Sequence, residues 1–536
     1  MTLERDNNLA SRILGTLPRG RGAIDVMMLV SLGAVNKGLG FLREAVMAAK
    51  FGADIRMDGL LAGQTIPAVL SKVMDEILGA SLLPLFASWT TQKGEAIAWA
   101  RLKQIVFYLL LGASVVVLSL LVFSGPVMTV LAPGLSAEGI HIAVRSLQIM
   151  LPSIAFFLLG SMLTAILNYY GRFFWGGLAA TLGNAFSLLC ILLYARQLDV
   201  YSVAIGITGG ALLLVIFQVP FVPRAARTWD TGNEAGARFG EFAKMAGPFG
   251  FAILLFNAIP FVERFLGSLL REGSLAILNY AFKVDWLVYS VFAIPVTTVT
   301  FPALASAAAL QDTTRFQRVL ALGVKGTLLL IAPCMVILVS LAVPIIQLLF
   351  QRGMFGPEQT ARTASVLVIY VFGLPGASIS LILFYALYAL GQPAVRLTAS
   401  VLSVLLSMIC GWVFTRFWDV QGIAWAHVVT LSLVAAYMAW ALRVLLGQCW
   451  SALISFVLRL CGAGLVSAVV CIVIYHQLAL WITGDPIPAQ VARIGVPSAV
   501  TLVVFYLLCW LWKVEEVKRI PDILWNARRI QANGIP

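Results

Sequence analysis

The stretch QIVFYLLLGASVVVLSLLVFSGPVMTVLA, residues 104–132, carries no charged side chain. A helix of about 20 such residues crosses the roughly 30 Å hydrocarbon core of a bilayer. Runs of this kind recur along the chain of 536 residues, of which 60% are hydrophobic and 11% charged, with a mean hydropathy of +0.94. A soluble domain has roughly 25% charged residues. The composition excludes a soluble enzyme, a disordered chain and a disulfide scaffold, and predicts an all-α integral membrane protein.

About fourteen transmembrane helices are expected, because that many apolar segments lie between polar or Gly/Pro breaks. The loops between them are short, so any chemistry must take place within the bilayer. Most of the 37 Lys and Arg lie in the termini and loops of one side, which predicts that both termini are cytoplasmic. The segments are 24–50, 58–86, 104–132, 143–170, 176–196, 201–223, 243–270, 274–303, 319–350, 360–391, 394–415, 421–442, 452–478 and 489–512.

An internal repeat divides these helices into two related sets. At an offset of 220 residues, Gly171 matches Gly391 and Asp199 matches Asp419, with further matches at Glu138/Glu358 and Cys190/Cys410. Six helices separate the copies, so the sequence predicts two six-helix lobes in parallel orientation, as in two-lobe transporters. Chance similarity between apolar stretches remains the alternative. The expected division is a basic cytoplasmic N-terminus (1–23), an N-lobe (24–223), a cytoplasmic linker (224–242), a C-lobe (243–446), two further helices (447–512) and a cytoplasmic tail (513–536).

Charged residues inside the apolar segments gather on the first, second, seventh and eighth helices, which are equivalent pairs in the repeat. A charge at the bilayer centre costs about 2.5–3.5 kcal/mol on insertion scales, so each needs a partner, a wet cavity or a function. We therefore expect a polar cavity between the lobes. These residues are Lys37, Arg43, Glu44, Lys72, Asp75, Glu76, Glu263, Arg264, Lys283 and Asp285, and Arg145 lies apart on the fourth helix.

The four lysines and arginines at 37, 43, 72 and 283 would repel one another in one cavity unless an anionic ligand balanced them. Lys72, Asp75 and Glu76 project to one side of their helix, since they are spaced i, i+3 and i+4. The alternative interpretation makes the charges ion pairs that hold the lobes together, and Arg264 a local partner of Glu263. The three histidines are dispersed, and the seven cysteines contain no CxxC pair, so we expect no catalytic site and no metal site.

In three segments, residues 36–58, 272–281 and 348–355, the chain resembles the MurJ (MviN) family, the lipid II flippases of bacterial cell-wall synthesis. The opening helix, NKGLGFLRE at 36–44 followed by Phe51-Gly52-Ala53 and Asp58, is similar to the family's first helix. Residues 272–281 resemble its turn between helices 7 and 8, and 348–355 its loop between helices 9 and 10. The resemblance implies a multidrug/oligosaccharidyl-lipid/polysaccharide exporter fold with alternating access, a cationic cavity for a diphosphate and sugars, and a groove for the polyprenyl tail on the final two helices.

By position, Arg43 and Asp58 match residues on which the family depends, and Lys37 keeps a basic residue. The chain departs from the family elsewhere: Ser71-Lys72 replaces two arginines, Glu76-Ile77 replaces an acidic-glycine step, and Lys283 replaces an arginine. Lysine keeps the charge but lacks the bidentate fork that suits phosphate. The candidate substrate-binding residues are Lys37, Arg43, Asp58, Lys72, Glu76, Arg264, Lys283 and Asp285.

The leading hypothesis is a flippase in the bacterial cytoplasmic membrane that moves undecaprenyl-diphosphate-linked lipid II to the outer leaflet. The alternative is a flippase for another polyprenyl-linked glycan, such as an exopolysaccharide or capsule repeat unit. A drug exporter, a membrane glycosyltransferase and a silent scaffold fit the sequence less well. No P-loop motif is present, so the membrane potential or a coupling cation (Na⁺ or H⁺) is expected to drive transport, with no cofactor. The expected partners are the lipid-linked glycan and membrane lipids, without nucleic acid, for a monomer.

Overall fold

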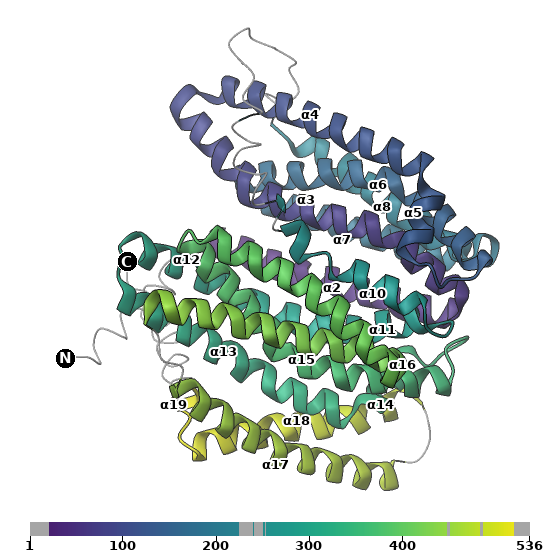
Figure 1. The fold of residues 1–536 in the computed structure, drawn as a ribbon, viewed down its shortest axis with the longest axis vertical. Helices are drawn as coiled ribbons and strands as arrows, with labels where there is room; N and C mark the ends of the chain where they lie inside the picture. Colours follow the sequence, from purple (N-terminus) through teal and green to yellow (C-terminus); the bar gives the residue numbers. More distant parts are fainter. Residues whose placement is uncertain are drawn as a thin grey trace.

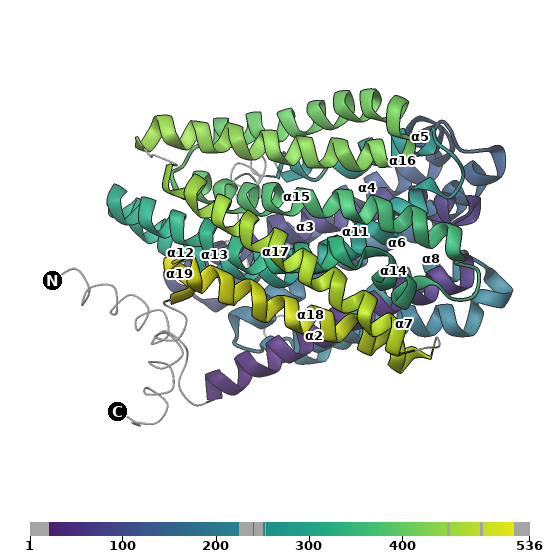
Figure 2. The same ribbon diagram turned by 90° about the horizontal axis from the view of Figure 1, so that it is seen from below.

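The computed structural model describes residues 21–223, 240, 250, 251, 253–447, 451–482 and 486–518. Within these ranges every regular element is a helix, and Figures 1 and 2 show most helices running roughly parallel to one another. The all-α prediction is confirmed. The predicted N-terminal segment and linker, and the end of the predicted tail, lie mostly outside the described residues, and the remaining domain boundaries stay predictions.

The N-lobe consists of long helices that pack through small residues. Gly63 on α3 faces α6 so closely that a Cβ would collide with the carbonyl oxygen of Ala143, and Gly183 and Gly210 bring α7 and α8 together in the same way. Small residues let helix backbones approach where lipid supplies no hydrophobic driving force. The helices are α2 (Arg21–Phe51), α3 (Ile55–Lys93), α4 (Glu95–Val122), α5 (Ser124–Leu131), α6 (Ala137–Tyr169), α7 (Phe173–Leu198) and α8 (Tyr201–Gln218).

The C-lobe holds two irregular helices. A π-helical turn, η3 (Tyr289–Ala293), joins α11 (Ser274–Val288) to α12 (Ile294–Ala309). In α16 (Pro393–Leu446), Trp418 and Asp419 have non-helical backbone angles, so this element is two helices joined at a kink, as the segments 394–415 and 421–442 predict. The remaining helices are α10 (Ile259–Ser268), α13 (Thr313–Ser340), α14 (Ala342–Phe350) and α15 (Pro357–Ala389).

Two final helices, α17 (Ser451–Trp481) and α18 (Ile487–Leu511), lie against the C-lobe on the side away from the N-lobe (Figure 1). They pack on α13, and the short α19 (Glu515–Lys518) is fixed there by an ion pair of 2.8 Å between Lys325 and Glu516. Among the described residues, the extra pair thus packs mainly on the C-lobe.

Among the residues that the structure describes, ten helices are long and apolar enough to cross a membrane. The kinked α16 counts once among them, and the charged helices α2 and α3 are not included. The membrane-protein prediction is confirmed, while the count of fourteen stays a prediction.

The internal repeat has a counterpart in the backbone. Asp199 and Asp419 have nearly the same left-handed φ angles, 49° and 48°, and Gly171 and Gly391 have φ angles of 69° and 64°. A positive φ is uncommon for a residue other than glycine. Since both pairs are 220 residues apart, the same rare turns occur at equivalent helix ends, which supports a duplication.

Candidate functional site

The buried carboxylate of Glu44 on α2 is the centre of a polar cluster between the lobes. Its Oε1 lies 3.3 Å from Nη2 of Arg43 and 3.2 Å from Nζ of Lys283, and the amide of Asn279 donates to its Oε2 at 3.2 Å. Glu44 is only 4% exposed. Two cations from different lobes therefore share one buried carboxylate. Hydrogen bonds between such charged groups are stronger than those between neutral groups.

Asparagines of the N-lobe orient Arg43. Its Nη1 lies 3.5 Å from Oδ1 of Asn184 on α7, and the amide of Asn184 in turn donates to Oδ1 of Asn36 at 2.7 Å. Asn36 and Arg43 are seven residues, or two helical turns, apart on α2, and both side chains face α7. Lys37 and Glu44 have the same spacing, and both side chains face the C-lobe.

Lys37 reaches the π-helical turn of the C-lobe. Its ammonium donates to the carbonyl oxygen of Ser290 at 2.8 Å. In this turn the amide of Ile294 bonds the carbonyl of Tyr289, five residues back. The next amide in that register would belong to residue 295, which is proline and has no N–H. The Lys37 ammonium therefore donates to the Ser290 carbonyl in place of the backbone N–H that Pro295 lacks.

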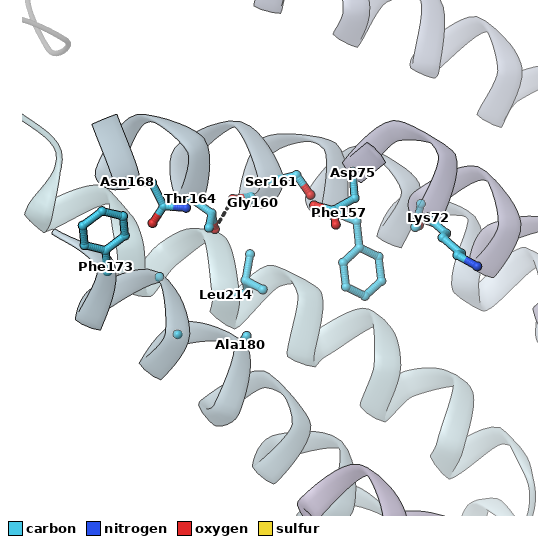
Figure 3. Close-up of a pocket in the computed structure, with 13 residues that line it drawn as sticks. Lys72, Asp75, Phe157, Gly160, Ser161, Thr164, Asn168, Phe173, Ala180 and Leu214 are labelled. Atoms are coloured by element: carbon cyan, nitrogen blue, oxygen red, sulfur yellow. Dashed lines mark hydrogen bonds between the residues drawn. The ribbon is translucent and has the colours of Figure 1, made fainter. Parts of the chain in front are cut away.

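Lys72 on α3 meets the C-lobe through an aromatic ring, with Nζ 5.1 Å from the ring centroid of Trp286. Together with Asp75 it also lines a cavity of about 460 Å³ within the N-lobe, walled by α3, α6, α7 and α8. Figure 3 shows Lys72 at one end of this cavity, with its ammonium directed away from Thr164 and Asn168 at the other end. Glu76 is exposed, one helical turn beyond Lys72.

One face of α11 and η3 receives the contacts that Glu44, Lys37 and Lys72 make with the C-lobe, and Arg43 is linked to this face through Glu44. Asn279, Lys283, Trp286 and Ser290 follow one another at spacings of four, three and four residues, and therefore form a single stripe on the helix. We call these four residues the polar face of α11. The predicted cations Lys37, Arg43 and Lys72 of the N-lobe gather along this face, and Lys283 belongs to it.

Asp58 lies apart from the polar face, at the end of the helix bundle where α2 ends and α3 begins. Its Oδ2 accepts from the amide of Gly273 at 2.7 Å and its Oδ1 from the amide of Ala276 at 2.8 Å. An acidic side chain at the N-terminus of a helix satisfies otherwise free amides and interacts favourably with the helix dipole. Asp58 of the N-lobe thus caps α11 of the C-lobe, and it is 2% exposed.

Two further hydrogen bonds to backbone carbonyls connect the lobes near Asp58. The hydroxyl of Tyr280 donates to the carbonyl of Gly52 at 3.1 Å, and the amide of Met354 donates to the carbonyl of Ala49 at 3.0 Å. Gly273 has a φ of 81°, and a Cβ there would collide with the carbonyl of Ala53. Residues 49–58, 273–280 and 353–354 together form what we call the interlobe joint.

Two of the predicted residues, Arg264 and Asp285, lie away from the polar face of α11. Nε of Arg264 on α10 donates to the hydroxyl of Thr65 on α3 at 3.3 Å. Asp285 lies off the stripe formed by the polar face of α11, and it is 7% exposed.

Near Asp285, His427 on α16 contacts Glu263 on α10, with 3.0 Å between Nδ1 and Oε1. Sequence reasoning missed His427, because its partner is 164 residues away. In the described part of the chain, no set of three His, Cys, Asp or Glu is placed to hold a metal.

The family model described as "Lipid II flippase MurJ" matches residues 47–491. The chain belongs to this family. Membership makes it a multi-pass protein of the bacterial inner membrane and a transporter, not an enzyme, and confirms the family resemblance. Among its relatives are a "Probable lipid II flippase MurJ" of Buchnera aphidicola subsp. Schizaphis graminum, 24% identical over 74% of this chain and 79% of the relative, and the "Lipid II flippase MurJ" of Burkholderia cenocepacia, 26% identical over 65% and 70%.

Solved structures share the fold. A structure of "Lipid II flippase MurJ, inward closed conformation" superposes with a TM-score of 0.76 at 20% identity, over 91% of this chain and 99% of that one. An inward-facing multidrug resistance transporter of the MATE family superposes with a TM-score of 0.63 at 12% identity, over 77% and 97%. At these identities the similarity shows a shared fold.

Proposed function

We propose that this protein moves lipid II, the undecaprenyl-diphosphate-linked peptidoglycan precursor, from the cytoplasmic to the periplasmic leaflet by alternating access. The observation that carries the proposal is the imbalance of charge at the polar face of α11. Four cations gather there against two carboxylates: Arg43 and Lys283 share Glu44, and Glu76 lies one helical turn from Lys72. Lys37 contacts a neutral carbonyl, and Lys72 also contacts an aromatic ring. A diphosphate supplies the negative charge that these neutral partners lack.

The relatives' names support lipid II as the cargo, since each is called a lipid II flippase or a probable one. In this chain lysines stand at positions 72 and 283, and lysine binds phosphate as a point charge. Such a site would hold the diphosphate without fixing its angle. Lys37, Arg43, Lys72 and Lys283 are proposed to bind it, and Asp58 and Arg264 to position the lobes around it.

Alternating access is supported by the position of the interlobe joint. The joint links the lobes at the helix ends opposite the start of α2. With both termini in the cytoplasm, as the distribution of Lys and Arg predicts, the joint lies on the periplasmic side and closes it. Transport then requires the joint to open while the cytoplasmic side closes, and the π-helical turn at 289–293 offers a place for α11 and α12 to bend.

Energy would come from the membrane potential or from a cation gradient. A charge that crosses the membrane gains about 2.3 kcal/mol per 100 mV. Both lobes of one chain build the polar face, so we propose that a monomer suffices.

The test is complementation of a bacterium depleted of its own lipid II flippase. The wild-type chain should restore growth, and Arg43→Ala should fail at equal membrane abundance. Arg145→Ala, which removes an exposed arginine of α6, serves as the matched control and should restore growth. Absence of rescue by the wild-type chain, with loss of a surface polysaccharide in its own knockout, would contradict lipid II as cargo and favour another polyprenyl-linked glycan.

A further inference from the structure

The N-lobe contains a cavity that the proposed diphosphate site leaves unexplained. Its volume is about 460 Å³, and it lies between α3, α6, α7 and α8 (Figure 3). Ligand pockets in proteins have volumes of roughly 300–1,000 Å³. One wall of this N-lobe cavity is a single face of α6, formed by Phe157, Ser161, Thr164 and Asn168. Their spacings of four, three and four residues place them in one row, which is about 16 Å long at about 1.5 Å per residue.

The hydroxyl of Ser71 on α3 has no hydrogen-bond partner among the described residues, although its oxygen is buried and the residue lines the cavity. A buried polar group without a partner is costly, so a ligand that bonds this hydroxyl recovers free energy that the protein alone does not. Along α6, Ser161 adds a second hydroxyl and Asn168 an amide, and both groups can donate and accept. The lining therefore matches a ligand that carries several hydrogen-bonding groups.

The charges of the lining favour a neutral ligand. Among the described residues that line the cavity, Asp75 is the one carboxylate and Lys72 the one cation. Figure 3 shows the Lys72 ammonium directed away from Asn168 at the far end, so an anion inside the cavity would not contact this ammonium. A sugar fits better, because its hydroxyls donate to a carboxylate. The carbon-bound hydrogens of its ring can pack on the apolar rings of Phe157 and Phe173.

Lys72 connects the N-lobe cavity to the polar face of α11. Its side chain lines the cavity, while its Nζ lies 5.1 Å from the ring centroid of Trp286 in the C-lobe. A diphosphate held by this ammonium therefore lies at the mouth of the cavity. In a polyprenyl-diphosphate-linked glycan the first sugar is bonded directly to the diphosphate, so it can enter the cavity while the charge stays at the polar face. With both termini cytoplasmic, as predicted, Asn168 near the end of α6 lies toward the cytoplasm, from which the cargo enters.

We propose that the N-lobe cavity is a glycan subsite, which holds the sugar nearest the diphosphate and selects the glycosylated lipid over the bare polyprenyl diphosphate. The sugar hydroxyls donate to Asp75 and exchange hydrogen bonds with the polar groups of the lining, and no covalent bond forms or breaks. The bare lipid carrier lacks these contacts and binds through its diphosphate alone. The inference rests on the proposed flippase function and adds how that function distinguishes a loaded carrier from an unloaded one.

The experiment measures the binding of two short-chain lipids to the full-length chain by calorimetry. One is farnesyl diphosphate, and the other is the same lipid carrying an N-acetylated disaccharide. The ratio of the two dissociation constants isolates the contribution of the sugar. The wild type should bind the glycosylated lipid about 30-fold more tightly, as expected for two neutral hydrogen bonds. Ser161→Leu places an apolar side chain in the cavity and should bring the ratio close to one.

A matched pair of serine variants tests the hydrogen bonds. Ser71→Ala removes the unbonded hydroxyl of the cavity, so the ratio should fall about fivefold, the equivalent of one hydrogen bond. The melting temperature should not fall, because this hydroxyl bonds nothing in the described part of the chain. Ser146→Ala removes another buried hydroxyl without a partner among the described residues, on α6 but outside the cavity lining, and should keep the wild-type ratio.

The outcomes separate the inference from the proposed function. Failure of the wild-type chain to bind either diphosphate would contradict the flippase function. Equal affinity of the wild type for both lipids, or an unchanged ratio in Ser161→Leu, would overturn the glycan subsite alone. Farnesol, which has neither the diphosphate nor the sugar, tests the remaining occupant: weaker binding of farnesol to Ser161→Leu than to the wild type would mean that the cavity holds the lipid tail, and would also overturn the subsite.

Discussion

The interlobe joint and the polar face of α11 connect the same two lobes by opposite means. In the joint, backbone groups meet one another, one carboxylate and the hydroxyl of Tyr280, and Gly273 permits a separation too small for any side chain. At the polar face, long flexible side chains reach across, and Lys283 keeps 34% of its side chain exposed. The first kind of contact depends on one relative position of the lobes. The second can be replaced by a ligand, which is what a transport site needs.

The largest expected effect comes from Lys283→Met. It removes one of the two cations on Glu44, and a hydrogen bond to a charged group is worth about 1.5–3 kcal/mol. Transport of fluorescent lipid II in proteoliposomes should fall by up to about 100-fold. Lys283→Arg should stay within a few fold of the wild type. Equal losses in both variants would mean that shape, and not charge, matters at this position.

Gly273→Ala should break the joint and leave the polar face chemically intact. A Cβ there would collide with the carbonyl oxygen of Ala53, and inserting an atom into a packed contact costs about 1–3 kcal/mol, which only the closed joint bears. The population with a closed joint should fall by about 30-fold, seen as loss of dipolar broadening between spin labels at Lys50 and Met354.

The matched control is Gly391→Ala. Its φ of 64° imposes similar backbone strain, but a Cβ there meets nothing within 4 Å. The closed population should therefore remain within twofold of the wild type. The same spectral change in both variants would show that backbone strain, and not the contact between lobes, explains the effect of Gly273→Ala.

Asp58→Asn should have a smaller effect on the joint. The amide keeps one acceptor but presents N–H groups to the amide of Gly273 or Ala276, so one of the two capping bonds is lost. Loss of a helix cap costs about 0.5–2 kcal/mol, which corresponds to about tenfold in the closed population. The Lys50–Met354 label pair measures it, and unchanged broadening would argue against capping as the role of Asp58.

The smallest effect is expected for Lys37→Met. Lys37 is exposed and contacts a neutral carbonyl, so its bond is worth about 1 kcal/mol and transport should fall about fivefold. The comparison is Ser290→Ala, which keeps the carbonyl and should leave transport unchanged. A 100-fold loss in Lys37→Met would instead make it an essential ligand, equivalent to Lys283.

The sequence predicted the helices, the repeat and the four cations, because apolar runs, a fixed offset and buried charges are local signals. It placed Asp58 with the substrate-binding residues on resemblance alone, whereas the structure has it capping α11, 215 residues from Gly273. It also missed the pairing of His427 with Glu263. Neither contact has a signal in spacing, since each depends on how the two lobes, or α10 and α16, come together. The bond from Lys37 to the Ser290 carbonyl was not predictable either, because it depends on the π-helical register at 289–293. A proline in the sequence does not specify that register.

We expect a diphosphate to bind between the N-lobe cations and Lys283 and to replace the direct contacts of those cations with the polar face of α11. Spin labels at two exposed positions, Val35 on α2 and Val291 in η3, report this contact through dipolar broadening. Addition of undecaprenyl diphosphate should reduce the broadening, while undecaprenol, which has the same tail without the charge, should leave it unchanged. Identical spectra with and without the diphosphate would contradict the claim.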